Sequence, residues 1–261
     1  MSGVVLSYYL PQDVRDLRFE FTDSTGKVFQ TVANPPKSKG FQRTSAFLQY
    51  PSYRTFPGMI VWSGFPSPIQ APPGEYTVTM IADGNKLPAK FKWLRDPRGS
   101  STDADLRQQF EFLQTVSAEI GEANGTVTRI RSLRSSLNRA MDEAKAKGDV
   151  SSLTANATSF LSGIQQVEEA IYQTKNRSGQ DPLNYPIRLN DKLAGVFSVS
   201  SGGNFRPTDQ AREVFALLSK QLDQQLAKLK SLEANELKSI NEELTKRGVK
   251  PVTVDALPDS P

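Results

Sequence analysis

The strongest constraint on the fold is a change in hydrophobic pattern near residue 99. Before it, short apolar runs are separated by prolines and by glycine-containing turns, which is typical of antiparallel β-structure. After it, proline is absent until Pro182, and apolar residues recur every three or four positions, as on one face of a helix. The chain is therefore predicted to be a multidomain α+β protein, with its strands first and its helices second.

The first part of the chain predicts short strands with one buried face. Leu17, Phe19 and Phe21 alternate with polar residues, as expected of a strand that lies on a core. Asp83 and Gly84 supply turn chemistry, because both residue types tolerate positive φ. The number and length of the runs predict an N-terminal Ig-like antiparallel β-sandwich over 1–97. Its strands are expected at 4–10, 16–23, 28–32, 46–49, 59–62, 75–82 and 90–94.

The second part predicts an elongated up-down helical bundle over 100–250, with three long helices and one short helix. Apolar residues at alternating steps of four and three form a seam along the second helix, as in helices that pack side by side. Gly248 and Pro251 are expected to end the last helix, which leaves 251–261 as a C-terminal tail. The predicted helices cover 102–147, 150–174, 187–198 and 208–246.

The chain has no cysteine and no histidine among its 261 residues. Disulfides, Cys–His and Ser–His–Asp nucleophiles, and the common zinc, haem and iron–sulfur ligand sets are therefore excluded. Carboxylates are the remaining broad acid–base groups, but Glu168–Glu169 and Glu242–Glu243 are neighbours that diverge on a helix surface, where they are expected to be solvated. We therefore expect no enzymatic activity, no catalytic residue, no cofactor and no metal site.

Charge argues against binding to nucleic acid. Arg129, Arg131, Arg134 and Arg139 on the first predicted helix suggest a phosphate-binding stripe, but residues 100–261 hold 20 lysines and arginines against 21 acidic residues. Residues 1–99 hold 12 against 7. The sequence contains no run of 18 apolar residues, so no membrane-spanning helix is predicted. The first ten residues lack the basic and apolar regions of a signal peptide.

An aromatic-rich, proline-rich segment follows residue 40. Such rings can form a platform for sugars or peptides, although filling a core is their commoner fate and is the favoured interpretation. A glycan or peptide platform stays the alternative. The candidate ligand or partner surface consists of Arg43, Tyr50, Tyr53, Arg54, Phe56 and Trp62.

Several segments resemble one bacterial family. Residues 40–51, 71–80 and 83–84 resemble the C-terminal Ig-like domain of large bacterial sortilin-like β-propeller proteins with BNR repeats. The helical region that follows this domain in the family is similar to 96–98, 103–106, 123–131, 183–193 and 207–208. The resemblance does not include the propeller and implies no catalytic residue, although family members are often labelled glycosyl hydrolases. It implies a parent protein that is exported or extracellular.

We therefore predict a non-catalytic structural or protein-interaction region, the C-terminal part of a larger exported bacterial β-propeller protein. Its expected partner is the propeller module or another protein. One alternative is a carbohydrate-binding accessory module of a glycoside-active enzyme. Another is a helical module that forms homodimers, so that the chain is either a monomer or a homodimer.

Overall fold

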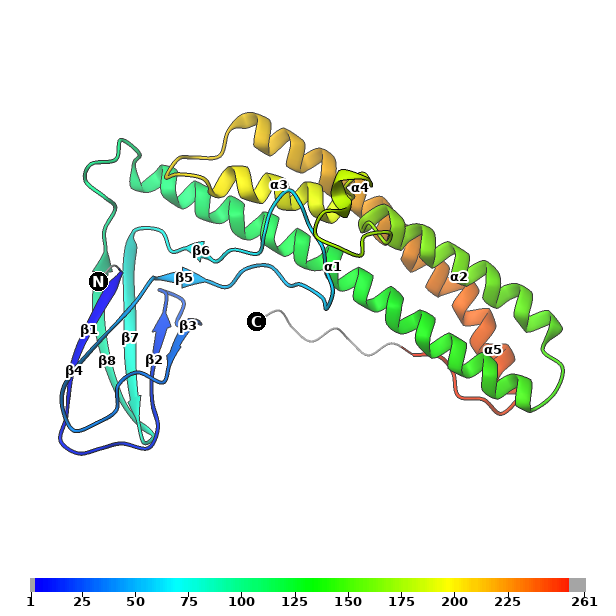
Figure 1. Ribbon diagram of the computed structural model, residues 1–261, viewed down its shortest axis with the longest axis horizontal. Coiled ribbons are helices and arrows are strands. Elements are labelled where there is room, and N and C mark those ends of the chain that lie inside the picture. Colours follow the sequence, from blue (N-terminus) through cyan, green and yellow to red (C-terminus); the bar gives the residue numbers. More distant parts are fainter. Residues whose placement is uncertain (1–2, 254–261) are drawn as a thin grey trace. The chain divides into compact units, whose positions relative to one another are not determined.

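The computed structural model describes residues 3–253, in which antiparallel strands are followed by helices (Figure 1). The mixed α+β class predicted from the sequence is confirmed. By packing, the chain divides into unit 1, which comprises Met1–Ser52, Ser67–Gln114 and Ser201–Pro207, and unit 2, which comprises Tyr53–Pro66, Thr115–Ser200 and Thr208–Pro261. The boundaries expected at 1–97 and 100–250 stay a prediction about independently folding domains.

The strands of unit 1 form three antiparallel sheets within the described residues. The largest has the strand order β3-β2-β7-β8, and the two smaller sheets pair β1 with β4 and β5 with β6. The strand bounds are β1 Val4–Leu10, β2 Leu17–Thr22, β3 Val28–Ala33, β4 Gly40–Ala46, β5 Gln49–Tyr50, β6 Ile69–Gln70, β7 Gly74–Ala82 and β8 Asn85–Trp93.

The β1–β4 pair and the four-stranded sheet share one hydrophobic core. Phe19 and Phe21 of β2 are buried as their alternation predicts, and Leu6 of β1 belongs to the same cluster. The ring of Tyr8 contacts that of Phe19 edge-on, with centroids 5.1 Å apart. Because successive residues of β1 face opposite ways, this contact leaves Val5 and Tyr9 on the outer face of the strand.

The β7–β8 hairpin has the turn that the sequence predicts. Asp83 and Gly84 connect the paired residues Ala82 and Asn85, with φ of +47° and +86°. Two consecutive positive φ angles match the twist of the flanking strands, which is why Asp-Gly is favoured here. Pro88 lies in β8, at the edge of the sheet, where the missing N–H costs no ladder hydrogen bond.

Two of the predicted strands are wrong. Residues 59–62 form coil and the start of a bend, and 46–49 is not a continuous strand. Of these residues Val61 is buried and Met59 and Ile60 are half-buried in unit 2, so apolar residues occur here without strand pairing. Strand β4 was missed because Gln42, Thr44 and Ser45 give no apolar alternation, and the strand is stabilised by long-range pairing with β1.

The predicted helices are present, with small changes at their ends. Thr102 and Asp105 form a reciprocal capping box at the start of α1, in which the Asp105 N–H donates to Thr102 Oγ1 over 3.1 Å and the Thr102 N–H donates to the Asp105 carboxylate over 2.9 Å. A π-helical turn, Glu233–Leu237, joins the last two helices. The bounds are α1 Asp103–Ala146, α2 Ser151–Ile171, α3 Leu189–Ser201, α4 Asp209–Leu232 and α5 Lys238–Lys246.

In unit 2, α2 packs against both α4 and α5, and it runs beside the second half of α1 in Figure 1. The apolar seam predicted for α2 is buried, including Phe160, Ile164 and Val167. Gly248, with φ +68°, ends α5 as predicted, and the Val249 N–H donates to the Leu244 carbonyl over 3.0 Å. Of the predicted tail, residues 254–261 lie outside the described residues.

Unit 1 is predicted to lose stability at alkaline pH through Tyr76. Its hydroxyl donates to the Pro72 carbonyl over 2.8 Å, and burial raises its pKa to about 12. Tyrosine in an unfolded chain ionises near pH 10, so the contribution of Tyr76 is complete below about pH 10 and is lost as pH rises toward 12. Urea unfolding between pH 8 and 11.5 should show a smaller alkaline loss for Tyr76→Phe than for the wild type. Equal losses in the two proteins would contradict this account.

Candidate functional site

Four of the six candidate surface residues lie on one segment of unit 2, residues 53–66, which we call the 53–66 loop. Tyr53 and Phe56 are buried, Arg54 is half-buried, and the Trp62 side chain is 46% exposed. The two buried rings therefore pack in the interior of unit 2 and form no platform for a sugar. Arg54 is held through its backbone, since its carbonyl accepts a hydrogen bond from Asn124 over 2.7 Å.

The buried rings of the loop have specific neighbours on the helices. The Tyr53 ring meets that of Phe197 edge-on at 5.7 Å, and its hydroxyl donates to the Gly64 carbonyl over 3.0 Å. Burial raises the pKa of Tyr53. The Phe56 ring lies edge-on to Tyr172, with centroids 5.0 Å apart, and the guanidinium of Arg131 lies 4.8 Å from the Phe56 ring centre. These contacts join the loop to α1 through Arg131, to the end of α2 through Tyr172, and to α3 through Phe197.

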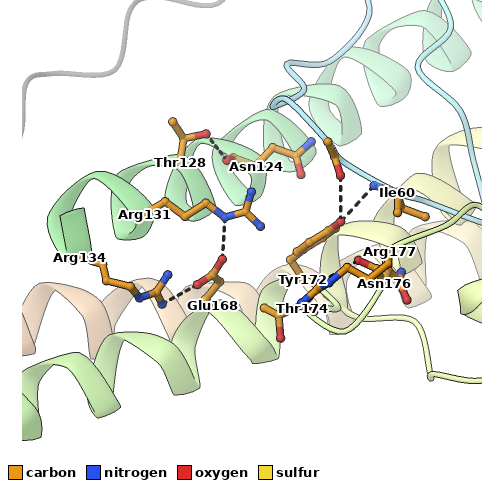
Figure 2. A network of polar contacts seen from close by, with 11 residues as sticks. Ile60, Asn124, Thr128, Arg131, Arg134, Glu168, Tyr172, Thr174, Asn176 and Arg177 are labelled. Carbon is orange, nitrogen blue, oxygen red and sulfur yellow. Dashed lines mark hydrogen bonds and ion pairs between the residues drawn. The ribbon is translucent and has the colours of Figure 1, made fainter.

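Arg131 also belongs to an ion-pair triad around a buried carboxylate. Figure 2 shows Arg131 and Arg134 of α1 reaching the same carboxylate, Glu168 of α2, at 2.8 Å and 2.7 Å. The side chain of Glu168 is only 4% exposed, so its predicted place on a solvated helix face is wrong. Its two arginine neighbours come from another helix and are invisible to a pattern within α2. They supply the opposite charges that let a carboxylate be buried.

The predicted arginine stripe is largely used for pairing within unit 2. Arg129 makes a two-point contact with Glu233, at 2.7 Å and 3.0 Å, where the π-helical turn begins. Two further arginines of the row pair with Glu168, and Arg139 hydrogen-bonds to Ser136 over 3.3 Å. A phosphate group would have to compete with these carboxylates for the same guanidinium groups.

Polar side chains of the helices bind the backbone of the 53–66 loop (Figure 2). The Tyr172 hydroxyl accepts a hydrogen bond from the Ile60 N–H over 3.1 Å and donates to the Gly58 carbonyl over 3.4 Å. The buried Asn124 side chain, which binds Arg54, also accepts a hydrogen bond from Asn190 over 3.1 Å. A loop buried among helices needs such partners, because its own backbone forms no ladder.

A second buried carboxylate also serves the loop. Asp191, in the first turn of α3, accepts hydrogen bonds from the backbone N–H groups of Trp62 and Ser63, over 2.9 Å and 2.7 Å. Next to this contact, Gly64 lies against α3 so closely that an added Cβ would be 2.2 Å from the Ala194 carbonyl oxygen. The carboxylate is thus engaged in holding the loop.

The other two candidate residues lie in unit 1. Tyr50 stacks on Phe29 with centroids 4.1 Å apart, and its hydroxyl donates to Asp23 over 3.1 Å. Arg43, on the exposed side of β4, donates from Nε to the Ser7 hydroxyl over 3.3 Å. Four of the candidates therefore belong to unit 2, and these two belong to unit 1.

An exposed patch on the β1–β4 pair, of which only Arg43 was predicted from the sequence, contains two aromatic rings. Tyr9 and Phe41 are opposite residues with ring centroids 5.0 Å apart, and they are 53% and 88% exposed. Arg43, opposite Ser7, and the exposed Val5 lie on the same face of the pair. We call Val5, Tyr9, Phe41 and Arg43 the ribbon patch. The register between β1 and β4 is the signal that would have revealed it, and the polar sequence of β4 conceals that register.

Among residues 3–253, no group of three or more acidic residues is placed to hold a metal ion. Of the second adjacent pair, Glu243 contacts Lys246 at 3.1 Å, and Glu242 is exposed. None of the helices in this part of the chain combines the length and apolar character needed to cross a bilayer. The chain has no match among family models, curated proteins or solved structures. The family resemblance therefore stays a prediction.

Glu168→Gln is expected to destabilise unit 2 by about 2–4 kcal/mol. Breaking a buried ion pair costs about 3–5 kcal/mol, and the partial exposure of both arginines reduces this cost. Denaturant unfolding followed by helical circular dichroism measures the change. Glu169→Gln, one residue away and bonded to Gln165, is the matched control and should change stability by less than about 1 kcal/mol. Equal effects of the two substitutions would mean that the triad contributes little.

Gly64→Ala tests how closely the 53–66 loop lies against α3. The added methyl group would meet the Ala194 backbone, which cannot rotate away, so a loss of about 3 kcal/mol or more is expected. Gly179→Ala is the control, because a Cβ there meets nothing within 4 Å. Thermal unfolding compares the two variants with the wild type. A Gly64→Ala protein as stable as its control would refute the close approach.

Proposed function

We propose that this chain is a non-catalytic structural and protein-interaction region, an Ig-like sandwich followed by a helical bundle. In this proposal it is the C-terminal part of a larger exported bacterial β-propeller protein. The observation that carries the interaction role is the ribbon patch, where two neighbouring aromatic rings are exposed on two paired strands. The family assignment rests on the resemblance of the sequence segments.

The ribbon patch has the composition of a protein-binding surface. Aromatic residues and arginine are enriched at the energetic centres of interfaces, where they combine large contact area with little entropy loss. Tyr9 and Phe41 already contact each other, and seven consecutive residue pairs fix the register of their strands. The inner residue Leu6 is held in the core of unit 1. A partner would therefore meet a surface whose shape is set before binding.

The non-catalytic part of the proposal is supported by how the buried acidic groups are used. Glu168 is bound by two arginines, and Asp191 by two backbone N–H groups. General acid–base catalysis needs a carboxyl group that reaches a substrate and changes its protonation state. Neither group meets the first condition, because each is enclosed by the partners that it holds in place.

Homodimerisation is a second candidate that one observation favours. Val214 and Leu217 of α4 are 46% and 58% exposed and lie three residues apart, so they share one helix face. A second copy of the chain could cover this face. Light scattering would then give twice the 28.8 kDa of one chain, and Leu217→Lys would return the mass to that of a monomer. A monomer at all concentrations would remove this candidate.

The interaction role is tested with a photoreactive phenylalanine analogue at position 41, in the protein as its source cells make it. We expect a crosslink to a β-propeller sequence, and an antibody against this chain should detect a polypeptide much larger than 28.8 kDa. The same analogue at Asn156, an exposed position of α2, is the control. A single species of 28.8 kDa, with no crosslink beyond that of the control, would contradict the proposal.

A further inference from the structure

Unit 1 contains a pocket of about 540 Å³ that includes none of the six candidate surface residues. Its walls come from Gln49 of β5 and from four further segments, namely 67–73, 93–96, the beginning of α1, and 201–204, all of which belong to unit 1. Its volume falls in the range of about 300–1,000 Å³ that is typical of sites for small ligands. The chemistry of the lining residues then indicates which class of ligand the pocket can bind.

The lining combines side-chain amides and two aromatic rings with aliphatic and proline side chains, among them Pro72, Leu94 and Leu106. Four amides line it, from Gln49, Gln70, Gln109 and Asn204, and each amide group can both donate and accept hydrogen bonds. Trp93 and Phe110 supply the rings. From this lining we propose that the pocket binds a neutral oligosaccharide, whose hydroxyl groups pair with amides and whose C–H faces lie against aromatic rings.

The charges at the pocket favour a neutral ligand. Arg95 is paired with Asp103 at 3.4 Å, and its Nη1 donates to the Gly99 carbonyl over 3.3 Å. Asp96 is paired with Arg98 at 2.7 Å. A charged ligand would have to replace one of these ion pairs, whereas hydroxyl groups need only the amides and the backbone.

The pocket also suits a sugar better than a proline-rich peptide. Such peptides are extended and bind along grooves lined with several aromatic rings. Here one indole and one phenyl ring lie among four amides in a compact pocket, so hydrogen-bonding groups outnumber rings. A short oligosaccharide matches that ratio, since each sugar unit carries several hydroxyl groups for each apolar face.

Hydrogen bonds join the walls of the pocket to one another. Gln109 of α1 donates from Nε2 to the Gly203 carbonyl over 3.1 Å, and the Ser101 hydroxyl donates to the Asn204 carbonyl. Arg107 donates to the Pro73 carbonyl over 3.5 Å. These bonds join segments 201–204 and 67–73 to the beginning of α1, so little ordering cost is left for binding.

The proposed site goes beyond the interaction role of the chain and can fail without it. The ribbon patch consists of Val5, Tyr9, Phe41 and Arg43, none of which lines the pocket. Trp93 lines the pocket, whereas the other tryptophan, Trp62, lies on the 53–66 loop of unit 2. With two tryptophans in the chain, Trp62→Phe leaves Trp93 as the single indole reporter inside the pocket.

The experiment titrates the Trp62→Phe protein with neutral hexasaccharides of glucose, xylose, mannose and N-acetylglucosamine, followed by Trp93 fluorescence and by calorimetry. We expect saturable binding of at least one sugar, weakened at least tenfold by the double substitution Gln70→Ala and Asn204→Ala. Both residues are exposed, so the variant should keep the thermal midpoint of its parent. Gln12→Ala, an exposed glutamine of unit 1 that does not line the pocket, is the matched control and should leave binding unchanged.

Three results would overturn the proposal. The first is the absence of saturable binding in both fluorescence and calorimetry. The second is sugar binding that the double variant retains, which would place the sugar elsewhere. The third is saturable binding of decaproline with no sugar bound, which would make the pocket a peptide site. None of these results bears on the crosslink at Phe41, so the two proposals are tested separately.

Discussion

Unit 2 depends on satisfying the backbone of a loop that carries no regular structure. The 53–66 loop places its N–H and C=O groups among helices, where each unpaired group would cost about 1–3 kcal/mol. Three polar side chains meet this need, namely Asn124 of α1, Tyr172 directly after α2, and Asp191 of α3. Close packing then becomes feasible, as shown by the absence of room for a Cβ at Gly64. The loop and the helices thus determine each other's positions within the unit.

The same constraint explains how two carboxylates of unit 2 can be buried. A buried carboxylate needs opposite charge or several donors, and both Glu168 and Asp191 have them. Arg131 makes two stabilising contacts, because its guanidinium pairs with Glu168 and also lies over the Phe56 ring. Groups that stabilise the fold in this way are not available to a substrate. The two binding features that we propose, the ribbon patch and the pocket, both lie in unit 1.

Much of the fold could be predicted because its signals are local. The helix ends follow from capping residues such as Thr102 and from Gly248, and the burial of Phe19 follows from alternation along one strand. What could not be predicted depends on residues far apart in the sequence. The burial of Glu168 requires arginines of another helix, and the position of Phe41 requires the register of β4 against β1.

The two recognition features proposed for unit 1 differ in the source of their binding free energy, and this difference can be measured. Burial of the ribbon patch removes the apolar surface of Tyr9 and Phe41 from water, which gives a negative heat-capacity change on binding. The pocket exchanges hydrogen bonds with water for hydrogen bonds with amides, so its binding should be driven by enthalpy with a smaller heat-capacity change. Neither mode depends on a net charge on the partner, so both should vary little with salt. A strongly salt-dependent interaction would instead direct attention to the basic excess of residues 1–99, which hold 12 lysines and arginines against 7 acidic residues.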